Sequence, residues 1–374
     1  MHDRMGEKVK RMKIMPNRMD RGFYQYQEEF EKKALEVLRS GWYVLGNEVE
    51  QFEEEFASYV GSKYCVGLAS GLDALWMAFR ILGVGAGDEV LVQSNTYIAS
   101  VMGITINGAT PVFVEPDTFY GIDASAIEDK ITDKTKAILV VHLYGQACEM
   151  DTICAIAKKH NLYLVEDCAQ SHGACYNGQM TGTFGDIGCF SFYPSKNLGA
   201  FGDGGAITTD DPQIAEKMKI YRNYGSEKRY YNMVVGTNSR LDELQAGLLR
   251  VRLSHMQELT EEKIRIGERY DRELKNDAFS LPQRREHANH VFHQYVLRTN
   301  RREELIKYLE EKGIGTIIHY PIPPHLAQAY EYLGFKRGDY PVAELFADEV
   351  LSIPMYNGMT QEEQTYVIEA LNAF

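Results

Sequence analysis

The sequence has no long hydrophobic run: nowhere do about 18 apolar residues follow one another, the length that a membrane-spanning helix requires. Its start, residues 1–21, is polar and basic and lacks the apolar core of a secretory signal peptide. The six cysteines form no Cys-x-x-Cys pair, and the apolar surroundings of several of them favour buried, reduced thiols over a zinc site. We therefore expect a soluble cytoplasmic protein that binds neither a membrane nor a metal ion.

A basic surface is also missing. Acidic residues outnumber basic ones by 53 to 40, the formal charge is −13, and no stripe of lysine and arginine is present, which argues against a nucleic-acid partner. Hydrophobic residues make up 44% of the chain and charged residues 25%, as in ordinary globular proteins, so intrinsic disorder is not expected. An anionic substrate therefore has to be met by a few placed cations and by backbone amides.

Short apolar runs alternate with helix-period stretches between about Lys63 and Thr209. Nearly continuous apolar runs indicate strands buried on both faces, and their alternation with helices indicates right-handed βαβ crossovers. We therefore expect an α/β fold with a mostly parallel sheet and functional residues at the carboxyl ends of its strands. The expected strands are 64–68, 89–93, 110–115, 137–142 and 162–166, and the helices between them are 73–82, 97–107, 124–131 and 150–160.

The pattern changes after Gly182. Two short strands, 186–192 and 204–209, are joined by a glycine-rich connection, and a long helical region runs from 242 to about 275. A smaller unit with a strand and several helices follows, so we expect a large domain and a smaller C-terminal α+β domain. The expected C-terminal elements are a strand at 293–298 and helices at 301–312, 343–350 and 361–371. The expected division is a polar leader at 1–25, a large domain at 26–255 and a small domain at 256–374.

Two charged residues stand at strand ends in the most informative stretch. Asp167 ends a buried strand, where a carboxylate is costly unless it is paired, and Lys196 enters a glycine-rich turn. A lysine and a carboxylate at neighbouring strand ends suit pyridoxal 5'-phosphate (PLP), because the lysine forms the Schiff base and the carboxylate keeps the pyridine nitrogen protonated. On spacing alone, the alternative is a structural salt bridge between the two side chains.

A phosphate site is offered by Ala69–Leu75, which lies between a strand and a helix, so that backbone N–H groups and the helix dipole face an anion. The alternative is a plain N-cap, in which Ser70 or Asp73 holds the first turn. Tyr97 follows the strand that ends at Gln93 and is a candidate for stacking on a cofactor ring. The alternative for Tyr97 is an ordinary half-buried tyrosine.

Two segments, Glu166-Asp-Cys-Ala-Gln170 and Ser191-Phe-Tyr-Pro-Ser-Lys-Asn-Leu198, resemble the DegT/DnrJ/StrS-type sugar aminotransferases. The resemblance runs from about Tyr26 to the C-terminus. It implies the aspartate aminotransferase-like architecture, that is, a PLP-dependent transferase of fold type I with a large, mostly parallel domain and a smaller C-terminal domain.

The resemblance also implies roles for the matching residues. Lys196 forms the Schiff base with PLP, Asp167 pairs with the pyridine nitrogen, and the amino group is carried as pyridoxamine phosphate. Asn238 matches a residue that reaches the phosphate from the other subunit, which implies a homodimer with shared active sites. Leu72 departs from the threonine of many members, so more of the phosphate contact falls to backbone amides. The other implied cofactor contacts are Gln170 near the ring hydroxyl, Tyr97 on the ring, and Ser70, Gly71 and Ser191 at the phosphate.

Four segments, 95–100, 141–146, 222–226 and 315–325, are similar to the branch that aminates carbon 3 of dTDP-3-keto-6-deoxyhexoses with L-glutamate as donor. Arg240 is a candidate for a glutamate carboxylate or for an ion pair with Asp242 or Glu243. A carbon-4 aminotransferase, a PLP-dependent sugar dehydratase and a non-enzymatic regulator are the alternatives, and the presence of Lys196 disfavours the dehydratase. The candidate contacts to the nucleotide sugar are Arg222, Tyr224, Lys228, Arg229, Tyr320 and His325.

Overall fold

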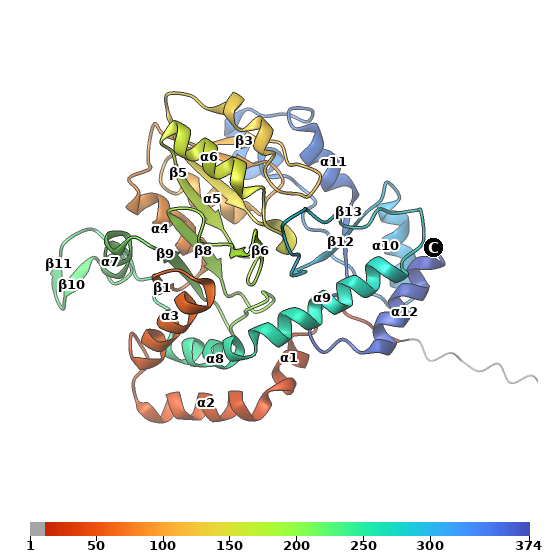
Figure 1. Cartoon of the computed structure of the whole chain (residues 1–374), viewed down its shortest axis with the longest axis horizontal. Helices are drawn as coiled ribbons and strands as arrows, with labels where there is room; N and C mark the ends of the chain where they lie inside the picture. The colour runs from red at the N-terminus through yellow and green to blue at the C-terminus, as the bar shows by residue number, and fades with distance from the viewer. Residues whose placement is uncertain (1–11) are drawn as a thin grey trace, which may run out of the picture.

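The computed structural model describes residues 12–374, and a seven-stranded sheet forms its centre (Figure 1). The strand order is β1-β9-β8-β5-β4-β2-β3. Only β9 runs against its neighbours, since the other pairs are parallel, so the expected α/β fold with a mostly parallel sheet is confirmed. The strands of this sheet are β1 (Tyr64–Leu68), β2 (Glu89–Gln93), β3 (Thr110–Val114), β4 (Thr135–Val141), β5 (Tyr163–Asp167), β8 (Ile187–Ser191) and β9 (Gly205–Thr209).

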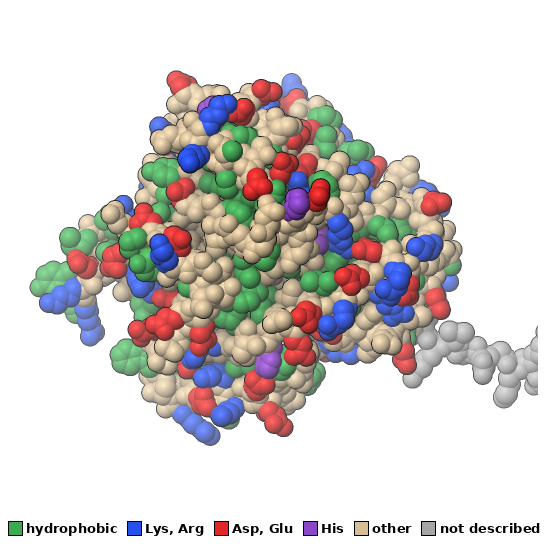
Figure 2. All heavy atoms as spheres, viewed as in Figure 1, with side chains coloured by type: hydrophobic (Ala, Val, Ile, Leu, Met, Phe, Trp, Pro, Cys, Tyr) green, Lys and Arg blue, Asp and Glu red, His purple; other side chains and the backbone are tan. Residues whose placement is uncertain are grey.

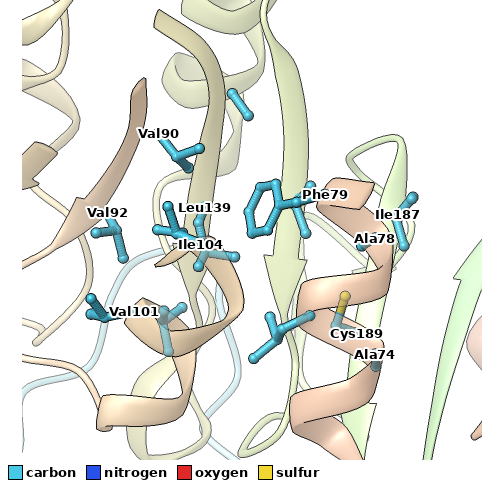
Figure 3. Close-up of a cluster of buried hydrophobic side chains, with 14 of the residues drawn as sticks. Ala74, Ala78, Phe79, Val90, Val92, Val101, Ile104, Leu139, Ile187 and Cys189 are labelled. Carbon is cyan, nitrogen blue, oxygen red and sulfur yellow. The ribbon is translucent and has the colours of Figure 1, made fainter. Parts of the chain in front are cut away.

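Helices cover the sheet and bury its apolar strands. Figure 3 shows Val90 and Leu139 of the sheet beside Ile104 and Phe79 of the covering helices, all four of them fully buried. Full burial of one such side chain stabilises the fold by about 1.5–3 kcal/mol relative to an exposed one. The helices that follow strands of the sheet are α4 (Gly71–Ile81), α5 (Ile98–Thr105), α6 (Met150–His160) and α7 (Pro212–Tyr221).

Residues 12–25, which we expected to form a polar leader, are part of the fold. Ile14 is 1% exposed, its backbone N–H donates to the carbonyl of Gly313 at 2.9 Å, and its own carbonyl accepts from Gly315 at 2.8 Å. The apolar side chain of Ile14 among basic neighbours was the only signal for this contact. The helices that follow in the chain are α1 (Met19–Gln25), α2 (Gln27–Ser40) and α3 (Asn47–Val60).

Two helix predictions are wrong in detail. The stretch 124–131 forms two 3₁₀ turns, η1 (Ala124–Ala126) and η2 (Glu128–Lys130), in place of the expected α-helix. The region 242–275 is not one helix but two, α8 (Glu243–Ser254) and α9 (Met256–Glu273). The break falls at His255, whose ring stacks on Tyr26 at 3.8 Å between centroids and whose Nε2 lies 3.0 Å from a carboxylate oxygen of Glu29.

The C-terminal part packs around a second apolar cluster that includes Tyr270, Tyr295 and Leu305. Other side chains of this part, among them Phe346, pack against the sheet, and the division at residue 255 stays a prediction. Within residues 12–374, no helix is long and apolar enough to cross a membrane. The turn η3 (Leu143–Gly145) follows β4 of the sheet. The C-terminal elements are β12 (Tyr295–Arg298), α10 (Arg302–Glu311), η4 (Pro324–Leu326), η5 (Gln328–Leu333), α11 (Pro341–Glu349), β13 (Val350–Ile353) and α12 (Gln361–Asn372).

Two short hairpins were not expected from the sequence. One pairs β6 (Cys175–Tyr176) with β7 (Gln179–Met180), and the other pairs β10 (Ser226–Lys228) with β11 (Tyr231–Asn232). Their strands are too short to produce a readable alternation of apolar and polar residues. The β10–β11 hairpin projects from the body of the protein beyond α7 (Figure 1).

Candidate active site

Asp167 lies at the carboxyl end of β5, next to β8 in the sheet, and is 6% exposed. The hydroxyl of Ser100, from α5, donates to its Oδ2 at 2.7 Å, and the backbone N–H of Ala169 donates to its Oδ1 at 3.1 Å. Burial raises the pKa of the Asp167 carboxyl above its usual value, while these two donors and the charge of Lys196 act in the opposite direction. The carboxylate is thus held by neutral donors and by the nearby ammonium group of Lys196.

Lys196 follows β8 in a turn, where its backbone N–H donates to the carbonyl of Tyr193 at 2.8 Å. Burial lowers the pKa of the Lys196 amine to about 8, and the negative charge of Asp167 acts against this shift. The charge of each of these two side chains therefore shifts the pKa of the other at the carboxyl end of the sheet. An amine with this pKa is partly neutral, and hence nucleophilic, near physiological pH.

Glu166, the residue before Asp167, points to the other side of β5, as the alternation of a strand requires. Its carboxylate accepts from the backbone N–H groups of Gly182, Phe184 and Gly185 at 2.8–3.0 Å, and lies 2.9 Å from Nε2 of His142. The Sγ atom of Cys168, a carboxylate oxygen of Glu166 and a ring nitrogen of His142 lie within 4.8 Å of one another. Because the oxygens of Glu166 already accept these bonds, this cluster fixes the end of β5 and so positions Asp167.

Gly71 begins α4 directly against β8. A Cβ atom at this position would lie 2.5 Å from the Cβ of Ser191, so only glycine allows this approach. Ser70 is the N-cap of α4, and its hydroxyl accepts from the backbone N–H of Asp73 at 3.1 Å. The N-terminus of α4, with its partial positive charge, thus faces Ser191 and can receive an anion there.

An aromatic group lies beside this centre. Gln170 accepts from the backbone N–H of Tyr144 at 2.7 Å and donates to the Tyr320 hydroxyl at 3.0 Å. The rings of Tyr320 and Tyr97 lie 5.1 Å apart, and Tyr97 is 52% exposed, so part of its ring remains free. Tyr320 comes from the C-terminal part of the chain, which therefore contributes to the same site as the sheet.

Several expected substrate residues lie on or beside the β10–β11 hairpin, apart from the sheet ends (Figure 1). Lys228 and Arg229 are exposed and lie over the rings of Tyr231 and Tyr230. Arg240 donates to the side chain of Asn223 at 3.1 Å and lies over the ring of Tyr224, and it forms no ion pair with Asp242 or Glu243 in the described chain. Asn238 is exposed at the base of the hairpin, where it pairs with Asn223.

Two expected substrate residues are placed differently by the structure. Arg222 is 7% exposed, forms an ion pair with the buried Glu53 and donates to the carbonyl of Gly67 at 2.7 Å. His325 is 1% exposed, with its Nε2 at 3.1 Å from an oxygen of Glu344. Both side chains are enclosed by their own partners, which favours structural roles, and the contact of Arg222 and His325 with a sugar nucleotide stays a prediction.

Arg222→Met is expected to lower the free energy of unfolding by about 3–5 kcal/mol, because it leaves the Glu53 carboxylate buried without its counter-charge. Urea denaturation monitored by circular dichroism measures this change. Arg229→Met, on the exposed hairpin, serves as the control and should stay within about 0.5 kcal/mol of the parent. Equal stability of the two variants would show that the ion pair does not hold the interior.

Sequence reasoning missed the groups that surround Asp167 and Lys196. His172 is 1% exposed, and neither ring nitrogen has a hydrogen-bond partner in the described chain. Burial lowers the pKa of His172 to about 3 and that of His319 to about 4, and the charge of Lys196 acts in the same direction. Both imidazoles are therefore neutral. The available signals were the polar Ser100 within an apolar helix and the place of His172 in the motif that contains Asp167.

Residues 25–372 match the DegT/DnrJ/EryC1/StrS aminotransferase family. Over 351 residues, which cover 94% of this chain and 96% of the relative, the chain is 51% identical to the dTDP-3-amino-3,6-dideoxy-alpha-D-galactopyranose transaminase of Aneurinibacillus thermoaerophilus. The crystal structure of DesV from S. venezuelae in complex with a ketimine intermediate is similar, with a TM-score of 0.95 at 42% identity, covering 96% of this chain and 98% of DesV. The structure of NtdA from Bacillus subtilis with bound cofactor PMP has a TM-score of 0.88 at 30% identity, covering 98% of this chain and 86% of NtdA. The chain therefore belongs to the DegT/DnrJ/EryC1/StrS aminotransferase family.

Proposed function

We propose that the protein uses PLP to transfer the amino group of L-glutamate to carbon 3 of a dTDP-3-keto-6-deoxyhexose. The observation that carries the proposal is the charge interaction between Asp167, at the end of β5, and Lys196, in the turn after the neighbouring β8, beside the close approach of Gly71 to Ser191. Position 3 of the sugar is supported by the 51% identity to a transaminase named for a dTDP-3-amino sugar.

The residues at the site fit PLP. The Lys196 amine is the group for covalent attachment, and the Asp167 carboxylate is available to a protonated pyridine nitrogen. Gly71 leaves room at the N-terminus of α4 for a phosphate, with the Ser191 hydroxyl and Ser70 beside it. The free face of Tyr97 offers a stacking surface, and Gln170 is the proposed neighbour of the ring hydroxyl.

When bound, PLP supplies the electron sink that lets a proton leave the α-carbon of the amino acid. The Lys196 amine would hold the cofactor covalently and, as a free amine, would be the base that takes up and gives back the substrate proton at its Nζ; its pKa of about 8 suits both roles. Asp167 would hold the protonated pyridine nitrogen of the cofactor with its negative charge. His172 and His319 are neutral and thus add no charge next to the amine.

The pKa of Lys196 predicts the pH dependence of cofactor attachment. Protonated lysine is not nucleophilic, so the rate at which cofactor-free protein takes up PLP should rise about tenfold per pH unit below pH 8 and level off above it. A free-lysine value would place the plateau near pH 10.4 instead. Stopped-flow absorbance of the bound cofactor between pH 6 and 10 measures the rate, and a rate that still rises tenfold per pH unit up to pH 10 would contradict the described environment of Lys196.

A homodimer with shared active sites is part of the proposal. Asn238 is exposed at the base of the β10–β11 hairpin and is free to reach the phosphate in a second subunit. The hairpin region exposes apolar side chains, with Val235 at 92% and Met233 at 65%, and Figure 2 shows apolar and basic side chains together on this projection. Apolar surface of this kind favours burial against another protein surface. Analytical ultracentrifugation should give twice the chain mass.

The nucleotide sugar then binds between the two subunits. Lys228, Arg229 and Arg240 supply positive charge for its diphosphate or for a glutamate carboxylate, and Tyr224 and Tyr320 offer hydroxyls to the sugar. All six cysteines lack a disulfide bond in the structure, which fits a protein located in the reducing cytoplasm.

The test of this function follows the absorbance of the bound cofactor. L-Glutamate should bleach the visible band of the lysine-linked cofactor and release 2-oxoglutarate. The bleached protein is then offered dTDP-3-keto and dTDP-4-keto deoxyhexoses in separate reactions, and the 3-keto sugar should restore the band. Recovery only with the 4-keto sugar would replace the proposal by carbon-4 amination, and a protein that takes up no PLP would favour a regulator.

A further inference from the structure

A small cavity of about 40 Å³ lies beside the turn that carries Lys196. Its wall includes this turn, Arg18 from the N-terminal segment, Arg252 of α8, Lys263 of α9, and Tyr356. No aspartate or glutamate of the described chain lines it. The cavity does not include Gly71, Ser191 or Asp167 and is therefore separate from the proposed phosphate site.

Lys263 is a buried amine whose protonated form has no counter-charge in the described chain. It is 5% exposed, and its Nζ donates to the side-chain oxygen of Asn197 at 2.9 Å and lies 3.5 Å from the carbonyl of His293. Both acceptors are neutral, and no carboxylate of residues 12–374 forms an ion pair with Lys263. The neighbouring Glu262 accepts instead from Asn357 and Gly358 at 2.8 and 3.0 Å. A buried ammonium group left in this state is strongly destabilising.

Two further polar groups line the cavity: among the described residues, Arg252 lacks a counter-charge, and the Tyr356 hydroxyl lacks a hydrogen-bond partner. Arg252 donates to the carbonyl of Gly199 at 2.8 Å and forms no ion pair in the described part of the chain. The hydroxyl of Tyr356 is buried and has no hydrogen-bond partner there. Arg18, by contrast, is paired with Asp20 at 2.6 Å. The pKa of Lys263 is lowered to about 7 by burial and by the charge of Arg252, which reflects the same excess of positive charge.

We propose that this cavity binds a small monovalent anion, of the size of chloride or formate, between Lys263, Arg252 and the Tyr356 hydroxyl. The volume suffices, because a site for one water-sized particle needs only about 10–15 Å³. Water alone fills such a space without supplying the missing negative charge. The anion also stabilises the active site, because Lys263 holds Asn197, whose amide donates to the carbonyl of Val291 at 3.0 Å and which directly follows Lys196.

The test measures thermal unfolding of the PLP-loaded protein, so its result does not depend on the identity of the sugar. Chloride is titrated against gluconate, which is too large for the cavity, at constant ionic strength. The midpoint of unfolding should rise by about 2 °C as chloride reaches tenfold its half-saturating concentration, with formate acting similarly. An equal effect of chloride and gluconate would overturn the proposal.

Variants locate the effect. Lys263→Met removes the charge with little change of length and should abolish the chloride response, whereas Lys136→Met, at an exposed position of β4, should keep it. Tyr356→Phe removes only the hydroxyl and should raise the half-saturating chloride concentration about three- to tenfold. This variant tests the chloride site if Lys263→Met does not fold. An unchanged chloride response in Lys263→Met, or in Tyr356→Phe where only that variant folds, would overturn the site.

Crystals grown with sodium bromide give a direct readout. The anomalous signal of bromide should show a peak between the Lys263 ammonium and the Arg252 guanidinium groups. A cavity without a peak, in crystals where bromide is seen at other places, would overturn the proposal.

Discussion

Replacing Lys196 by alanine is expected to reduce transamination by at least about 10⁴-fold, because one change removes both the covalent anchor of the cofactor and the base that moves the proton. The variant should still fold, since the Lys196 amine forms no hydrogen bond within the described chain and its removal leaves no polar group without a partner. It should also still bind PLP without a covalent bond, because the contacts at Gly71 and Asp167 remain. Activity with L-glutamate and the keto sugar measures the loss, and a borohydride-treated sample analysed by mass spectrometry measures covalent attachment.

Lys263→Arg is the matched control for the loss of a lysine near this turn. Lys263 donates to the side chain of Asn197 and is not the residue that forms the Schiff base. Arginine supplies a positive charge at position 263, so covalent attachment of the cofactor should persist. The proposal that Lys196 anchors the cofactor and moves the proton would be contradicted if the alanine variant retained more than about one hundredth of the parent rate. In that case another amine would have to carry the cofactor, and mass spectrometry of the reduced protein would identify it.

The fold was largely predictable because its strands are short, apolar and buried on both faces. β1 and β2 begin and end at the expected residues, and α6 matches its expected range 150–160. The sequence pattern is strong there because the strands are buried on both faces and the covering helix is apolar on the one face that packs against the sheet. It failed at His255, where an aromatic contact to Tyr26 breaks a sequence that is helical on both sides. Contacts between distant segments of this kind leave no periodic trace.

The site was predictable to a different degree at each residue. Asp167, Lys196 and Gly71 stand at strand ends or helix starts, where the topology itself brings them together. Arg222 and His325 were assigned to a ligand because they lie in the segments 222–226 and 315–325, which resemble the carbon-3 branch. Their partners, Glu53 and Glu344, lie 169 and 19 residues away, and only the folded chain reveals that these pairs are closed.

Asp167→Asn is expected to lower the rate of the glutamate half-reaction by about 10²–10³-fold, a loss typical of removing one preorganised electrostatic contact. The amide has nearly the same shape as the carboxylate: its oxygen can accept from the backbone N–H of Ala169, and its NH₂ group can donate to the hydroxyl of Ser100. Stability should not fall, because the variant replaces a buried charge, whose pKa burial has raised, by a neutral group. Single-turnover bleaching of the cofactor band by L-glutamate measures the rate.

The pH profile separates the electrostatic role of Asp167 from a merely structural one. In the parent, protonation of Asp167 removes the charge that faces the ring, so the rate should fall as the pH drops through its raised pKa. Asp167→Asn has no such group, and its residual rate should lack this acidic limb. Ser100→Ala, which removes only the 2.7 Å hydrogen bond to Oδ2, should keep the limb and shift it to higher pH, because the hydroxyl stabilises the ionised form. An acidic limb that persists unchanged in Asp167→Asn would assign it to another group and leave Asp167 a role in packing alone.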